Sequence, residues 1–152
     1  MADILIYGNV FINEYYTQHS EAHASANITK SDLAEVCSQI KELKPFGFYS
    51  FEASSVGPVA LTERTPEARE LYRKGRNYLS PVIIYEGECP NKTNEITIGV
   101  CLENGKYYIF TAFRGPLAPK EPGDPRCSDA ERPEAEAFWA KHALLCRADE
   151  LA

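Results

Sequence analysis

Histidines are the side chains of this chain that could move protons near neutral pH. There are three, His19, His23 and His142, and imidazole is the side chain whose unperturbed pKa lies closest to neutrality. His23 lies in a polar run ahead of the first expected helix, so we expect an exposed general acid or base there. His142 follows Phe138 and Trp139 on an expected helix, where a packed, hydrogen-bonded ring is the alternative to a proton carrier. Nothing has metal-ligand spacing, so we expect no metal and no cofactor.

A short basic run could bind phosphate. Arg69, Arg73, Lys74 and Arg76 fall within eight residues of an acidic chain, and Ser80 follows them. The planar guanidinium group matches phosphate oxygens, and a hydroxyl can donate to them as well. The alternative is a solvated helix end, where cations complement the helix dipole. Both interpretations stay open from the sequence.

The stretch from residue 107 to residue 125 changes character halfway along. Tyr107 to Phe113 is rich in aromatic and β-branched residues and predicts a strand, whereas residues 114–125 hold four prolines and two glycines and predict a loop. Thr111 and Phe113 should share one side of the strand. We expect Thr111 to donate to a phosphate oxygen and Phe113 or Arg114 to lie beside a base or ribose. Cross-strand packing and a purely connecting loop are the alternatives.

Composition limits the class of protein. With 152 residues, 44% hydrophobic and 25% charged, residues 1–152 predict a single globular domain. Five scattered cysteines fit reduced thiols, and without a signal peptide or a membrane-length apolar run we expect a cytoplasmic protein without a membrane partner. The net charge of −6 disfavours a sequence-tolerant nucleic-acid binder, because phosphate neutralisation dominates such binding.

The elements that must position these side chains predict an α+β fold. N-terminal helices are expected to pack on an antiparallel sheet, and a C-terminal helix follows. The clearest helix has apolar residues at helical spacing and a capping hydroxyl at Thr29 or Ser31. The expected helices are 29–43, 65–74 and 128–145, the last with Ser128 and Glu131 as a capping box or Pro133 as a later start. The expected strands are 4–7, 10–12, 46–51, 59–61, 81–86, 96–102 and 106–113, with tight turns at Gly8-Asn9 and at Asn104-Gly105.

Four segments in this order resemble a group of small bacterial and phage-associated proteins of unknown function. They are Ala22-His23 ahead of NITKSDLAEV, then RKGRNYLSPVII, KYYIFTAFRGPLAPKEPGDP and AFWAKHALL. This pattern is in turn similar to metal-independent ribonuclease toxins with the barnase–EndoU–colicin–RelE type fold. The resemblance covers about half of the chain, in pieces.

That resemblance implies a site. His23 would be a general base or acid and His142 the other proton carrier or a supporting residue. Arg73, Lys74 or Arg76 would bind the scissile phosphate, with Ser80 and Thr111 on its oxygens. The reaction would be attack of the ribose 2′-OH, giving a 2′,3′-cyclic phosphate and a 5′-OH end without metal. Thr111 and Arg114 would form the rim of a cleft walled by the loop of residues 116–125.

Two other functions remain open. Such toxins are commonly basic, so the acidic charge favours a non-catalytic binding or immunity-type protein that covers a basic protein partner. An enzyme that acts on a nucleotide, for example by ADP-ribosyl transfer, would use the same basic residues. The expected partner is therefore RNA or a nucleotide on the first and third interpretations, and a protein on the second.

Overall fold

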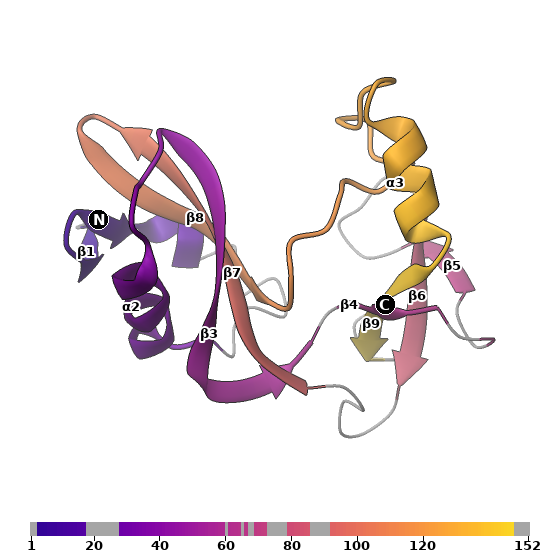
Figure 1. Cartoon of the computed structure of the whole chain (residues 1–152), viewed down its shortest axis with the longest axis horizontal. Helices are drawn as coiled ribbons and strands as arrows, with labels where there is room; N and C mark the ends of the chain where they lie inside the picture. Colours follow the sequence, from indigo (N-terminus) through magenta and orange to yellow (C-terminus); the bar gives the residue numbers. More distant parts are fainter. Residues whose placement is uncertain are drawn as a thin grey trace. The chain divides into compact units, whose positions relative to one another are not determined.

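The computed structural model describes residues 3–17, 28–59, 61–64, 66, 69–72, 79–85 and 92–147. Helices and strands both occur without βαβ alternation, so the α+β class is confirmed (Figure 1). The elements are β1 Ile4–Tyr7, β2 Val10–Ile12, α2 Lys30–Gln39, β3 Phe46–Pro58, β4 Leu61–Glu63, β5 Arg69–Tyr72, β6 Leu79–Tyr85, β7 Lys92–Glu103, β8 Lys106–Arg114, α3 Arg132–Trp139 and β9 His142–Arg147.

The chain divides into two compact units, each built from two segments. Unit 1 holds residues 1–57 and 93–117, and unit 2 holds residues 58–92 and 118–152. Each unit has its own sheet and its own cluster of buried side chains. The single domain expected over residues 1–152 stays a prediction.

Unit 1 is a five-stranded sheet in the order β1-β2-β8-β7-β3. The expected hairpins β1–β2 and β7–β8 are both present, and β2 pairs with β8 in parallel. The β7–β8 turn needs positive φ at two positions, which Asn104 (φ 52°) and Gly105 (φ 78°) supply. The sheet is therefore mixed: β2 pairs in parallel with β8, which follows it by nearly a hundred residues in the sequence, and the two hairpins are antiparallel.

Helix α2 covers one face of this sheet. Thr29 is its N-cap: the Thr29 hydroxyl accepts from the backbone of Asp32, and the Asp32 carboxylate accepts from the backbone of Thr29. The helix ends at Gln39, earlier than the expected Leu43. Its apolar side packs with the strands in one buried cluster, whose members include Val10, Ile12, Leu33, Val36, Cys37, Ala53, Ile96, Ile98, Val100, Ile109 and Ala112.

Unit 2 contains a four-stranded sheet in the order β4-β9-β6-β5, with β6 and β9 parallel. The expected helix over residues 65–74 is wrong, because Arg69–Tyr72 is extended and pairs antiparallel with β6. Pairing with a neighbouring strand overrides the local preference for a helix.

The C-terminal helix is shorter than expected. α3 runs from Arg132 to Trp139, with Pro133 in its first turn, and His142–Arg147 forms β9 instead of the end of a helix. β9 lies between β4 and β6 and pairs with both, so its backbone groups gain partners on two sides. That pairing explains why the predicted helix stops before residue 142.

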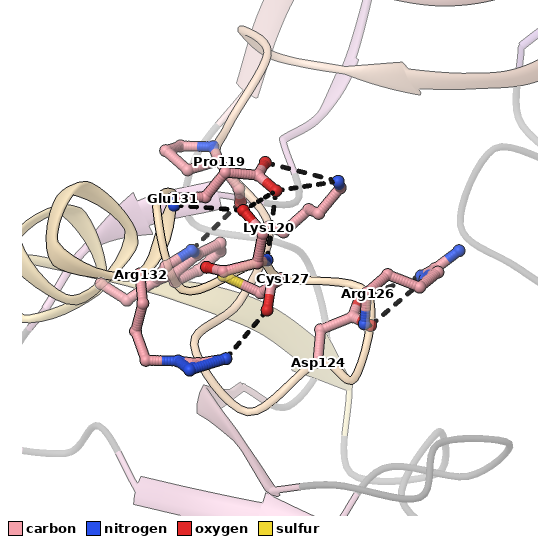
Figure 2. A network of polar contacts seen from close by, with 9 residues as sticks. Pro119, Lys120, Asp124, Arg126, Cys127, Glu131 and Arg132 are labelled. Atoms are coloured by element: carbon pink, nitrogen blue, oxygen red, sulfur yellow. Dashed lines mark hydrogen bonds and ion pairs between the residues drawn. The ribbon is translucent and has the colours of Figure 1, made fainter.

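The proline-rich loop after β8 is tied to α3 by polar contacts (Figure 2). Trp139 donates its indole N–H to the carbonyl of Pro119 (3.1 Å), and Lys120 lies 3.4 Å from the Glu131 carboxylate. Glu131 and Ser128 also exchange hydrogen bonds as a capping box does, although the helix itself starts at Arg132. These hydrogen bonds lower the pKa of the Glu131 carboxyl. From Ala118 onward the loop therefore belongs to unit 2.

Candidate functional site

The register between β3 and β7 determines which side chains meet on the sheet of unit 1. The backbone N–H of Leu102 donates to the carbonyl of Pro45 (2.7 Å), and the hydroxyls of Ser50 and Thr97 lie 2.6 Å apart. Both contacts fit one antiparallel register. It places Phe46 opposite Cys101, Phe48 opposite Gly99 and Glu52 opposite Glu95.

A β-bulge in β8 sets which residues face α2. Val100 pairs with Ile109 and Gly99 with Thr111, so Phe110 is the extra residue. Ile109 and Ala112 consequently both lie in the buried cluster under α2, although they are three residues apart. Thr111 and Phe113 lie on the opposite face, as expected, and both are partly exposed.

Aromatic rings gather on the sheet face that points away from α2. We call Phe11, Phe46, Phe48, Tyr108 and Phe110 the aromatic face. Phe46 stacks on Phe110 with centroids 5.4 Å apart, and Phe48 meets both rings edge-on at 5.8 Å. Phe11 and Tyr108 form a second pair at 6.2 Å. Phe46 keeps 64% of its surface exposed and Phe48 38%, so the rings pack on one another without being covered.

Gly99 allows these rings to close over the centre of the sheet. A Cβ at this position would lie 2.7 Å from the ring of Phe110 and 2.9 Å from the ring of Phe48. No side chain fits there while both rings keep their places. The glycine thus shapes the floor beneath the aromatic face.

One end of the aromatic face carries a polar cluster. Tyr108 donates its hydroxyl to Asp3 (2.7 Å), and Lys106 lies 3.5 Å from the same carboxylate and 5.2 Å from the centroid of Phe11. The hydrogen bond to Asp3, with some burial, raises the pKa of Tyr108 to about 12. The phenol therefore stays neutral and donating at physiological pH. Leu5 pairs with Phe11 and extends the apolar surface, 56% exposed.

Carboxylates lie at two ends of the aromatic face. Glu103 pairs with Lys106 at the end of the β7–β8 hairpin, near Asp3. At the other end Glu52 and Glu95 lie opposite one another in the register above, and Glu52 is exposed. These four carboxylates make both ends of the face acidic.

Arg114, a predicted substrate-binding residue, lies on the α2 side of the sheet. It is 5% exposed, donates to the hydroxyl of Ser55 (2.9 Å) and lies 3.7 Å from the carboxylate of Asp32. Its Nε packs against Gly57, where a Cβ would clash with it. Arg114 is therefore turned away from Thr111, and its described contacts join β8 to β3 and to the start of α2.

Asp32 is the acidic partner in this buried cluster. Burial acts to raise its pKa, but hydrogen bonds from Thr29 and Ser55 and the charge of Arg114 outweigh it, and the pKa of Asp32 is lowered. The carboxylate thus stays ionised while 6% exposed. A charged pair of this kind holds elements together and leaves little of the guanidinium for a ligand.

His142 lies at the start of β9 in unit 2. Its ring stacks on Phe138 (centroids 4.0 Å apart) and its Nδ1 lies 2.9 Å from the carbonyl of Phe138. Arg64 donates to the carbonyl of Trp139 (3.0 Å). Both side chains thereby satisfy carbonyl groups at the end of α3, where cations and donors are favoured.

The other predicted site residues are only partly described. His23, Arg73, Lys74 and Arg76 lie outside the described residues, and Ser80 is described as part of the β6 backbone alone. Thr111, Phe113 and Arg114 belong to unit 1, whereas Ser80 and His142 belong to unit 2. The predicted ribonuclease site therefore stays a prediction.

Sequence reasoning missed the aromatic face. The available signal was the alternation Phe46-Gly47-Phe48 in β3, together with Phe110 on the strand two places away in the sheet. Alternation predicts which residues of one strand share a face, but it does not predict that β3 lies beside β7 in the sheet. The bulge at Phe110 shifts the alternation of β8 as well.

The thiols of Cys37 and Cys101 are not activated. Burial raises the pKa of Cys37 to about 11, and burial with the charge of Glu103 raises that of Cys101, so neither is an activated nucleophile. Among the described residues, no three His, Cys, Asp or Glu side chains gather as metal ligands, and no helix is long and apolar enough to cross a membrane.

The comparisons with known proteins found no matching family model, no similar curated protein and no similar solved structure.

Proposed function

We propose that this chain is a binding protein and that the aromatic face of unit 1 contacts its protein partner. The observation that carries the proposal is the packing of Phe46, Phe48 and Phe110 on one sheet face, with Phe46 64% and Phe48 38% exposed. Contiguous exposed aromatic residues mark interaction surfaces, because leaving them in water costs free energy that a partner recovers. Aromatic side chains are also enriched among the residues that dominate binding energy.

The construction of the surface supports the same conclusion. Phe46 lies on the long strand β3 and Phe110 on β8, and both strands are held in a five-stranded sheet with α2 packed behind it. The rings are therefore presented on a rigid support, which lowers the entropy lost on binding. Such a surface needs no catalytic group.

The proposal is tested by selecting binders from a random peptide library against the immobilised protein. Selected peptides should lose affinity for Phe46→Ala by about tenfold or more, as expected for a central aromatic contact. Leu102→Ala is the matched control, because Leu102 is also exposed, at 41%, but lies on the α2 side of β7. Peptides that bind wild type and Phe46→Ala equally would contradict the proposal.

A metal-independent endoribonuclease is the second candidate. Besides the resemblance described above, one observation favours it: Thr111 and Phe113 lie on the same sheet face as Phe110, where a phosphate oxygen and an unpaired base could be held together. His23, Arg76 and His142 would supply proton transfer and charge, with Arg73, Lys74 and Ser80 on the phosphate.

Cleavage of RNA in EDTA tests this second candidate. Total bacterial RNA is incubated with wild type, His23→Ala and Arg76→Ala, with His19→Ala as the control from the same polar run. The ribonuclease interpretation requires cleavage that the first two substitutions abolish and the control retains, with 2′,3′-cyclic phosphate ends. Intact RNA between pH 5 and pH 8 would rule it out.

A further inference from the structure

Charge on the aromatic face distinguishes between classes of partner. Glu52 and Glu95 lie directly opposite one another across β3 and β7, by the register that the Ser50–Thr97 and Leu102–Pro45 contacts define. Like charges in such a pair repel and destabilise a sheet. Glu52 is exposed and Glu95 is partly exposed, so a cation of a partner can reach this like-charged pair and neutralise it.

The other end of the face is acidic as well. Asp3 and Glu103 lie beside Lys106, so two carboxylates meet one ammonium group. The five rings of the aromatic face lie between these two acidic ends. An apolar centre with acidic ends is complementary to an apolar segment that carries cations on both sides.

This inference rests on the proposed function. We propose that the partner of the aromatic face is a protein segment rich in aromatic or aliphatic residues flanked by lysine or arginine. Its apolar side chains pack against Phe46, Phe48 and Phe110. One cationic side chain lies between Glu52 and Glu95. A nucleic acid is disfavoured at this face, because its phosphates would meet the carboxylates at both ends.

Fluorescence anisotropy with defined probes tests this inference. The probes are a labelled hexapeptide alternating lysine with phenylalanine, the matched hexapeptide alternating glutamate with phenylalanine, and an oligouridylate of similar length. Wild type should bind the cationic peptide about tenfold more tightly than the anionic one at low salt, with the difference shrinking as salt rises.

Substitutions assign the effect to this face. Glu52→Gln with Glu95→Gln should weaken binding of the cationic peptide roughly threefold to tenfold, as expected for two charge contacts near the surface. Glu134→Gln with Glu136→Gln changes the net charge equally, but on the exposed side of α3 in unit 2, and should have no effect. Phe46→Ala should weaken binding of every peptide that uses the face.

Each outcome has one meaning. Equal binding of the two peptides, with both sensitive to Phe46→Ala, would overturn the inference about charge and leave the proposed function intact. Peptide binding that ignores Phe46→Ala would overturn the proposed function itself. Preferential, Phe46-dependent binding of the oligouridylate would overturn both in favour of RNA.

Discussion

At the scale of single residues, the space at two glycines and the ion pair between Arg114 and Asp32 shape the packing of unit 1. Gly57 leaves room for the Arg114 side chain, and Gly99 leaves room for two aromatic rings. Arg114 was predicted to bind substrate beside Thr111, but it lies on the opposite face of β8. Thr111 and Arg114 are three residues apart, so strand alternation puts them on opposite sides.

Asp32→Asn should make unfolding less sensitive to acid. The pKa of Asp32 is lowered in the folded protein, so its ionised form contributes stability above the unfolded-state value of about 3.9, and this contribution is lost as pH falls below it. Wild type should therefore lose stability between pH 5 and pH 3, and the variant should lose less over that range. Denaturant unfolding at several pH values measures both curves. Equal slopes would contradict this role of Asp32.

Gly99→Ala should open the aromatic face. Its Cβ would lie within 2.9 Å of the rings of Phe48 and Phe110, so the rings must move apart. Overpacking of this kind costs about 1–3 kcal/mol in the free energy of unfolding. Gly105→Ala is a useful comparison, because it strains the backbone at φ 78° with open space around it. Chemical shifts of the Phe48 and Phe110 ring protons should change only in Gly99→Ala.

At the scale of elements, local signals in the sequence were reliable where they acted alone. The Thr29 cap, the β1–β2 hairpin and the Asn104-Gly105 turn were all predictable, because each depends on a few adjacent residues. β5 and β9 were predicted as helix, since their strand state depends on pairing with β6. The candidate binding surface was unpredictable for the same reason: it needs the order of the strands.

Trp139→Phe should loosen the proline-rich loop without unfolding α3. The substitution keeps the aromatic packing of a 5% exposed side chain but removes the hydrogen bond to the Pro119 carbonyl. The loss of such a bond costs about 1 kcal/mol. Limited proteolysis should cut at Lys120 or Arg126 several times faster in the variant. Unchanged cutting would mean that the Lys120–Glu131 contact holds the loop by itself.

At the scale of the whole molecule, residues 58–92 are an insertion between two neighbouring strands of unit 1. β3 and β7 lie side by side in the sheet, and the chain between them builds part of unit 2 (Figure 1). The buried cluster under α2 draws all its members from unit 1. This arrangement implies that the core of unit 1 is complete without unit 2.

Unit 1 should fold alone. A chain of residues 1–57 joined by a short Gly-Ser linker to residues 93–117 keeps the five-stranded sheet, α2 and the aromatic face. We expect cooperative thermal unfolding and dispersed amide resonances, because its hydrophobic core is intact. Collapsed, poorly dispersed amide signals would show that unit 2 is needed for this fold.

The most direct test of the account is an amide chemical-shift titration of the full chain with the peptide that alternates lysine and phenylalanine. If the aromatic face binds this peptide, saturable shifts will cluster at residues 46–52 of β3, 95–101 of β7 and 108–113 of β8, and will be absent in Phe46→Ala. Shifts confined to unit 2, or none at millimolar peptide, would contradict the claim that the aromatic face is the functional surface.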